Sequence, residues 1–126
     1  MIKLSTYIFQ VLKSRNIDTV FMVTGGGAMH LNDSIAKSKD LRVIYTHHEQ
    51  GASIAAEGYA RVLNKPAILN VTTGPGSINA LNGVHGAYTD SMPMIVISGQ
   101  VKKETLSTSY DIEGIRQLGD QEVDII

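Results

Sequence analysis

The sequence lacks most of the features that mark secreted, membrane or nucleic-acid-binding proteins. It contains no cysteine, which excludes disulfides and thiolate metal sites and is typical of a reducing compartment. No apolar run approaches the roughly 18 residues of a membrane span, and the first residues do not resemble a signal peptide. The 11 basic and 12 acidic residues form no long block, so no nucleic-acid footprint is indicated. We therefore expect one soluble, cytoplasmic domain with no membrane or nucleic-acid partner.

The spacing of apolar residues predicts alternating helices and strands. Short apolar runs are typical of strands covered on both faces, and they occur at 19–23, 42–45, 67–71 and 94–98. Helical spacing of apolar residues predicts helices over 6–15, 28–38, 50–63 and 77–88. Ser5 or Thr6 is the expected cap of the first helix, and Asn16 suits its left-handed exit. The pattern predicts an α/β fold, a parallel sheet flanked by helices on both faces.

The regular pattern weakens after Gly99. Residues 112–118 are compatible with a short helix, and an apolar run begins at 123–126. We expect residues 1–126 to form a single domain that is incomplete at its C-terminus and lacks its last strand and helix. The chain would then be a fragment or a separately encoded subunit.

Glycines follow three of the predicted strands, at 25–27, at Gly51 and at 74–76. These junctions would meet at the carboxyl edge of a parallel sheet, where ligands usually bind. The spacing matches neither the dinucleotide-binding nor the P-loop motif. Glu49 stands at the second junction, between an apolar strand and a helix of small residues. The residues alone leave two hypotheses even: Glu49 belongs to a binding site, or it caps its own helix.

Other candidate groups have simpler interpretations. The neighbours His47, His48 and Glu49 diverge on a turn, and no H-E-x-x-H motif is present, so we predict no metal site. Glu57 and Arg61 are spaced for an exposed ion pair on one helix.

Three long motifs resemble the thiamine-diphosphate-dependent enzymes. The segment 48–61, HEQGASIAAEGYAR, is similar to their H-E-Q-G-A…A-E-G-Y-A-R motif, and 73–79, TGPGSIN, is similar to S/T-G-P-G-x-x-N. The segment 88–100, YTDSMPMIVISGQ, resembles their third motif, and the order and spacing also agree. By this resemblance the chain is similar to the N-terminal pyrimidine-binding domain of the acetolactate synthase group, which has the thiamine-diphosphate-binding fold.

The resemblance implies a role for each matching residue. Glu49 would be catalytic, with a hydrogen bond to N1′ of the cofactor's aminopyrimidine that promotes its imino tautomer. That imino group would remove the C2 proton of the thiazolium, which then attacks a 2-oxo acid. Further residues would contact the cofactor: Gly25, Gly26, Thr73, Gly74, Pro75, Gly76 and Asn79.

The substrate side departs from the family pattern. Gln121 matches the glutamine of a substrate-channel F-Q-E motif, but Asp120 replaces its phenylalanine, and Thr24-Gly25 replaces a Tyr-Pro. The resemblance therefore implies decarboxylation of a 2-oxo acid, with ligation or release of the carbonyl unit, without fixing acetolactate as the product.

The resemblance also implies a partner domain. In the family, the diphosphate and Mg²⁺ are held by a second domain through a G-D-G…N-N motif that this sequence lacks. The chain alone would be inactive, and whether FAD is also bound is left open. The alternative is a non-catalytic thiamine-diphosphate-binding or regulatory module.

Assembly is the last expectation from the sequence. The helix over 50–63 carries small residues suited to a close partner, either another subunit of a homo-oligomer or the sheet of its own domain. We expect self-association, or an exposed apolar patch around Ala52, Ala56 and Tyr59.

Overall fold

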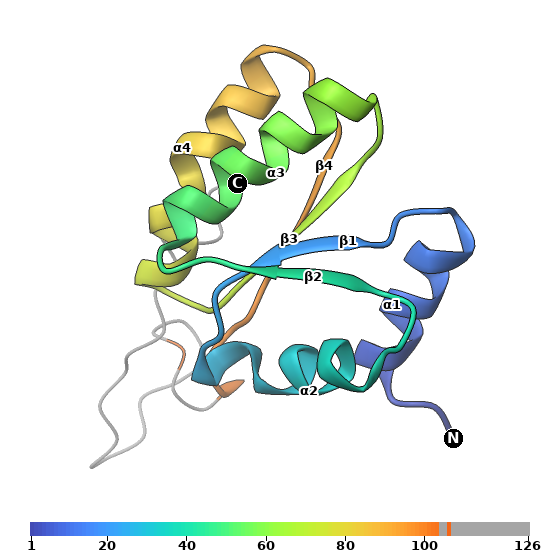
Figure 1. The fold of residues 1–126 in the computed structure, drawn as a ribbon. Coiled ribbons are helices and arrows are strands. Elements are labelled where there is room, and N and C mark those ends of the chain that lie inside the picture. The colour runs from blue at the N-terminus through green and yellow to red at the C-terminus, as the bar shows by residue number, and fades with distance from the viewer. Residues whose placement is uncertain (104–105, 107–126) are drawn as a thin grey trace.

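The computed structural model describes residues 1–103 and residue 106, and within them helices and strands alternate along the chain (Figure 1). The strands are β1 (Thr19–Met22), β2 (Arg42–Tyr45), β3 (Ala67–Val71) and β4 (Met94–Ser98). The helices are α1 (Leu4–Ser14), α2 (Met29–Lys37), α3 (Glu49–Leu63) and α4 (Pro75–Thr89), with a 3-10 turn η1 (Gly26–Ala28) before α2. The four strands form one sheet in the order β2-β1-β3-β4, and every pair is parallel.

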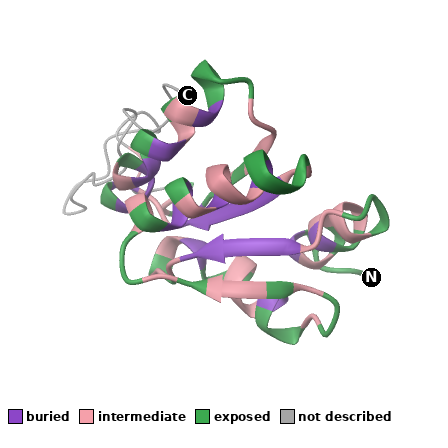
Figure 2. Cartoon of the chain, turned by 45° about the horizontal axis from the view of Figure 1, so that its top comes forward, coloured by how far each residue is buried: buried purple, intermediate pink, exposed green. Residues whose placement is uncertain are grey.

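The predicted fold class is confirmed: helices cover both faces of the parallel sheet (Figure 1). The helices α1 and α2 lie on one face, and α3 and α4 on the other. The central strands β1 and β3 are buried along their whole length, whereas β2 and β4 are only partly covered (Figure 2). Strands enclosed on both faces favour continuous apolar runs, which is why the sequence signals them so clearly.

The sheet divides the core in two. Phe21, Leu69 and Val71 belong to the cluster beneath α3 and α4. Val20 and Ile68 belong to the cluster beneath α1 and α2. Successive residues of a strand point to opposite faces, so each central strand contributes to both clusters. Within the described residues, no helix is long and apolar enough to cross a membrane.

Most predicted boundaries agree with the structure within one or two residues. The strands β2, β3 and β4 have the predicted limits, and Asn16 has the expected left-handed backbone, with φ 62°. The predicted cap of α1 is wrong. The helix begins at Leu4, and Ser5 turns inward, where its Oγ lies 2.7 Å from Ser34 Oγ on α2. The tentative helix at 112–118 and the apolar run at 123–126 lie outside the described residues.

The buried alanines of α3 serve contacts within the domain. Ala52 and Ala56 have no exposed surface. Tyr59 packs edge-on against Phe21, with ring centroids 5.7 Å apart, and its hydroxyl accepts a hydrogen bond from Thr19. The expectation of an exposed patch around Ala52, Ala56 and Tyr59 is therefore wrong, because the sheet and α4 already cover these residues.

The helices α3 and α4 are in tight contact at Gly83. A Cβ on Gly83 would lie 2.4 Å from the backbone carbon and the Oγ of Ser53. Only a residue without a side chain fits at this crossing. The predicted ion pair between Glu57 and Arg61 is also confirmed, and Arg61 additionally pairs with Asp90 just beyond α4.

We expect Gly83→Ala to destabilise the fold, because the new methyl group would force α3 and α4 apart. Overpacking of this kind costs about 1–3 kcal/mol. The matched control is Gly58→Ala on α3, where a Cβ meets no atom within 4 Å; the better helix propensity of alanine should stabilise it by roughly 0.5–1 kcal/mol. Denaturant unfolding of both variants checks this, and equal effects would contradict the packing argument.

Asp18, just before β1, forms ion pairs with α1 and with the turn between α3 and β3. Its Oδ1 pairs with Lys65 Nζ and its Oδ2 with Lys13 Nζ, each at 3.1 Å. The hydrogen bond from Lys65, together with the one from Lys13, holds the pKa of Asp18 below its usual range despite some burial. A carboxyl whose pKa is lower in the folded state stabilises the fold above its unfolded-state pKa, and this contribution is lost as the pH falls through the folded-state pKa.

We therefore expect Asp18→Asn to lower the free energy of unfolding at pH 7 by about 1 kcal/mol, the upper end for a partly exposed ion pair. The difference from wild type should shrink as the pH falls below about 4, the unfolded-state pKa of aspartate. Urea unfolding at pH 7 and pH 3 measures both. A difference that is the same at the two pH values would show that the ion pairs are not its cause.

Candidate functional site

Two strand-to-helix junctions bring Glu49 and Asn79 together. Glu49 is the first residue of α3, and Asn79 lies in the second turn of α4. Asn79 Nδ2 donates a hydrogen bond to Glu49 Oε2 at 3.1 Å. The strands β2 and β3, which precede these helices, lie on either side of β1, so their junctions share the carboxyl edge of the sheet. The contact between residues 30 positions apart defines the centre of the site.

Glu49 is not the residue whose side chain caps α3. The N-cap is His48, whose Nδ1 accepts a hydrogen bond from the backbone N–H of Gln50 at 3.2 Å. Glu49 is partly buried in the first turn, and within the described residues Asn79 is the side chain that bonds its carboxylate. The other oxygen, Oε1, faces Gly76, where a Cβ would lie 3.4 Å away. The carboxylate thus keeps one oxygen available beside a residue that has no side chain.

Thr72 joins the first glycine loop to this centre. Its Oγ1 accepts a hydrogen bond from Gly27 N–H at 3.0 Å. A Cβ on Gly25 would lie 2.4 Å from Thr72 Cβ, and one on Gly76 would lie 2.7 Å from Thr72 Cγ2. The glycines of two loops therefore pack directly on one threonine side chain.

The Gly74–Gly76 turn has a conformation that favours the start of α4. Gly74 has a φ of +63°, and its carbonyl accepts hydrogen bonds from Ser77 N–H and Ile78 N–H, both at 3.0 Å. Pro75 follows as the first residue of α4, where its fixed φ suits the helix and its missing N–H is not needed. Thr73 Oγ1 donates to Gln100 Oε1 at 2.9 Å, which links the turn to the segment after β4.

The structure places most of the predicted site residues at one edge of the sheet. Asn79 bonds Glu49, whose Oε1 faces Gly76, and Gly25 is linked to Gly76 through Thr72. Gly26 is exposed, and a Cβ there would meet no atom within 4 Å. Gln121 lies outside the described residues. The described part of the chain contains no group of three histidine, aspartate or glutamate residues that could hold a metal ion.

Sequence reasoning missed several residues that organise the site. Thr72 and His48 stand beside predicted site residues, but neither was assigned a role. A pair of asparagines, Asn32 and Asn70, was also missed, although an amide inside the otherwise apolar run 67–71 is an unusual choice. The polar residue inside an apolar strand could have indicated a buried hydrogen bond, because a buried amide needs a partner.

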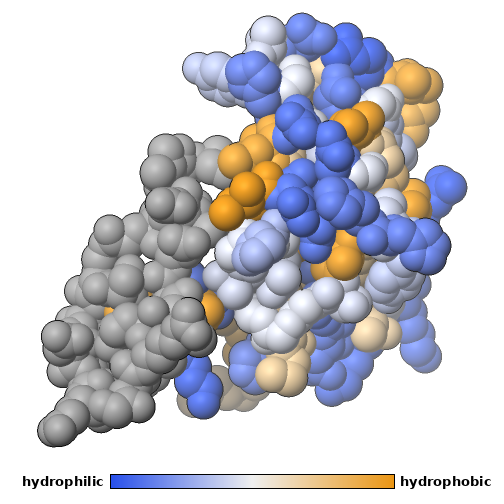
Figure 3. Space-filling model, turned by 90° about the vertical axis from the view of Figure 1, so that its left-hand side faces the viewer, coloured by the Kyte–Doolittle hydropathy of each residue, from blue (hydrophilic) through white to orange (hydrophobic). Residues whose placement is uncertain are grey.

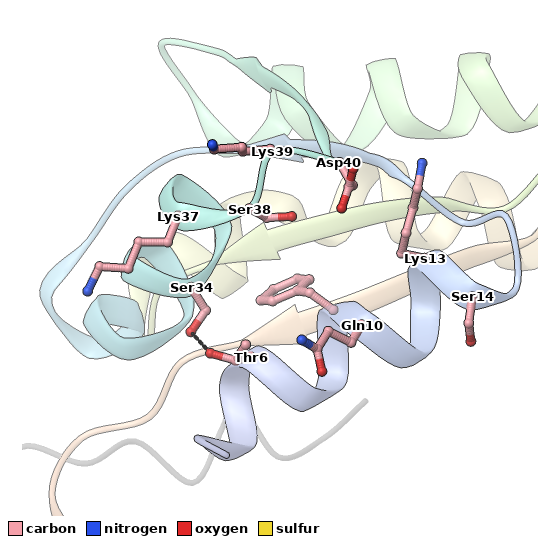
Figure 4. Close-up of a pocket in the computed structure, with 10 residues that line it drawn as sticks. Thr6, Gln10, Lys13, Ser14, Ser34, Lys37, Ser38, Lys39 and Asp40 are labelled. Carbon is pink, nitrogen blue, oxygen red and sulfur yellow. Dashed lines mark hydrogen bonds between the residues drawn. The ribbon is translucent and has the colours of Figure 1, made fainter. Parts of the chain in front are cut away.

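A hollow of about 530 Å³ lies elsewhere, between α1 and α2 (Figure 4). Phe9 lines it together with polar side chains such as Lys13, Ser34 and Asp40. Much of its rim comes from the ends of α1 and α2 that lead into β1 and β2, the opposite edge of the sheet from Glu49. The hollow is therefore separate from the glycine-loop site.

Comparison with known proteins agrees with this architecture. Residues 2–125 match the family described as "Thiamine pyrophosphate enzyme, N-terminal TPP binding domain". The chain is therefore a member of this family, and its parallel sheet is that of a thiamine-diphosphate-binding domain.

Similar curated proteins are acetolactate synthases. The mitochondrial catalytic subunit of acetolactate synthase from Saccharomyces cerevisiae is 41% identical over 113 residues, which are 86% of this chain and 16% of that protein. The chloroplastic acetolactate synthase 2 of Brassica napus is 39% identical over 80% of this chain and 16% of its own length. The large subunit from Lactococcus lactis is 40% identical over 77% of this chain and 17% of its own length. The chain thus spans about one sixth of the length of these relatives.

We expect Gly25→Ala to disturb the site, because the added methyl would overlap Thr72 Cβ. The loop would have to move, at a cost of about 1–3 kcal/mol in stability. Gly26→Ala is the matched control, since open space surrounds that position. Thermal unfolding of the two neighbouring variants measures the difference. A Gly25→Ala protein as stable as Gly26→Ala would mean that the packing on Thr72 is not tight.

Proposed function

We propose that this chain forms the pyrimidine-binding part of a thiamine diphosphate enzyme that acts on a 2-oxo acid, as a lyase or transferase of the acetolactate synthase type. The main support for the proposal is the environment of the Glu49 carboxylate. Asn79 donates a hydrogen bond to one of its oxygens, and the other oxygen faces a glycine. Membership of the family and the similarity to acetolactate synthases support the same function.

The residues fit an aminopyrimidine ring. A flat ring with a basic nitrogen needs a carboxyl oxygen that can share a proton with that nitrogen, and walls without side chains. Glu49 Oε1 beside Gly76 offers both. The open position at Gly26 leaves further room next to this edge. We assign contacts with the cofactor to Gly25, Gly26, Glu49, Thr73, Gly74, Pro75, Gly76 and Asn79, and Gln121 to the substrate side.

Each residue of the centre has a defined task in this proposal. Glu49 Oε1 would share a proton with the ring nitrogen N1′ through a hydrogen bond when the cofactor is bound. Asn79 fixes the carboxylate by donating to Oε2, so that Oε1 keeps its direction. Thiamine diphosphate, when bound, supplies the carbanion chemistry at its thiazolium ring, and the protein orients and tunes it.

The proposal requires a second domain. The described residues include no cluster of metal ligands, and the sequence lacks the diphosphate-binding motif, so we assign the diphosphate and Mg²⁺ to a domain elsewhere in the assembly. We propose a cytoplasmic location from composition, although the similar proteins of Brassica napus and Saccharomyces cerevisiae are chloroplastic and mitochondrial.

The outer face of α3 is suited to contact that domain in a homo-oligomer. Gly51, Ile54, Gly58 and Val62 recur every three or four residues, and Ile54 and Val62 are 49% and 80% exposed. A Cβ on Gly51 or Gly58 would meet nothing within 4 Å inside this domain. Figure 3 shows hydrophobic groups, in orange, in the upper half of the molecule, which is the height at which Figure 1 shows α3 and α4. The two glycines therefore leave space for another backbone rather than for the sheet below them.

We expect Glu49→Gln to slow C2–H exchange of bound thiamine diphosphate by about 100-fold or more, because an amide cannot exchange a proton with N1′. The matched control is Glu57→Gln on the same helix, which should leave the exchange rate unchanged because Glu57 pairs with Arg61 at the surface. Proton exchange followed by NMR in the complete protein makes the measurement.

The same experiment separates the alternatives. Exchange that is unchanged in Glu49→Gln would contradict the role given to this carboxylate. A wild-type protein that binds thiamine diphosphate but neither exchanges C2–H nor converts a 2-oxo acid would instead be the non-catalytic module.

A further inference from the structure

A polar side chain lies inside β3, one of the two central strands of the sheet. Asn70 belongs to β3, whose other residues are apolar, and it has no exposed surface. Two positions earlier on the same strand, Ile68 belongs to the core beneath α1 and α2, so Asn70 points to that face as well. An amide at this place opposes folding unless its polar atoms find partners.

Asn70 is bonded to a second asparagine that reaches the glycine loop. Asn70 Nδ2 donates to Asn32 Oδ1 at 3.0 Å, and Asn32 Nδ2 donates to the carbonyl of Gly25 at 3.2 Å. Only a donor can face the Gly25 carbonyl, which fixes the orientation of Asn32. Its Oδ1 must then face Asn70, which fixes the orientation of Asn70 in turn. The two amides form a one-directional relay from the sheet to the loop.

The relay leaves one atom without a partner. Asn70 Oδ1 is buried and accepts no hydrogen bond from the described residues. A leucine of similar size would avoid this loss and would suit the surrounding apolar core. Stability alone therefore does not explain the asparagine, and its remaining task is to hold Asn32 against Gly25.

The held carbonyl lies next to the cofactor-binding edge. Gly25 packs on Thr72, Gly27 N–H bonds Thr72 Oγ1 at 3.0 Å, and Thr72 in turn packs on Gly76 beside Glu49. Movement of Gly25 would thus be passed through Thr72 to the glycine that faces Glu49 Oε1.

We propose that Asn32 and Asn70 are positioning residues: their amide relay fixes the Gly25 carbonyl, and through it the loop 25–27 over Thr72 at the cofactor site. The link to cofactor binding rests on the proposed function. The two hydrogen bonds of the relay are present in the chain without cofactor.

The test uses Asn32→Leu, Asn70→Leu and the double variant in the complete protein. The first readout is amide hydrogen exchange of the loop 24–28 without cofactor. We expect exchange to become about tenfold faster than wild type in each single variant. The double variant should exchange no faster than either single variant, because both substitutions break the same relay. The melting temperature of Asn70→Leu should stay the same or rise. Ile68→Val, on the same face of β3, is the control and should lower the melting temperature without changing loop exchange.

The second readout is C2–H exchange of bound thiamine diphosphate. We expect it to slow by about 10- to 100-fold in the relay variants, the range for a small misplacement of a site, with little change in the Kd for the cofactor. Loop exchange at the wild-type rate in Asn70→Leu would overturn the relay. Faster loop exchange with an unchanged C2–H rate would overturn its link to the cofactor site. A wild-type protein without C2–H exchange would overturn the proposed function and this link with it, while the loop measurement would still report on the relay.

Discussion

The close packing of two glycine loops on Thr72 is the constraint on which the site depends. Thr72 follows β3, the buried strand next to the centre of the sheet, and its position is fixed by that strand. A Cβ on Gly25 or Gly76 would overlap its side chain, so both loops can approach it only as glycine. One side chain therefore sets the distance between the loop after β1 and the turn before α4, and Gly76 in that turn borders Glu49.

The packing of α3 on α4 fixes the second half of the geometry. Ser53 lies four residues after Glu49, and Gly83 lies four residues after Asn79, which is one helical turn in each case. The tight contact of the two helices at Ser53 and Gly83 is therefore one turn away from the bond between Glu49 and Asn79. Because Gly83 lets the helices pack this closely, the amide lies within reach of the carboxylate.

In our proposal, the buried amide of Asn70 serves position rather than stability. Asn70 interrupts an apolar strand and leaves one oxygen without a partner, yet it holds Asn32 against the Gly25 carbonyl. Polar atoms placed in a core are costly unless they are bonded, so their presence indicates a requirement that apolar packing cannot meet. Here the requirement is a fixed loop, since apolar contacts have no direction and a hydrogen bond does.

The sequence by itself determined the parallel sheet, nearly all element limits, and Glu49 with the glycine turns as candidates, because strands buried on both faces and helices with one apolar face leave periodic patterns. Only the tertiary structure decided the rest. It showed that His48 caps α3, that Asn79 holds Glu49, and that Ala52 faces the core rather than a partner. These outcomes depend on contacts between residues far apart in the chain, which arise from packing and leave no local pattern in the sequence.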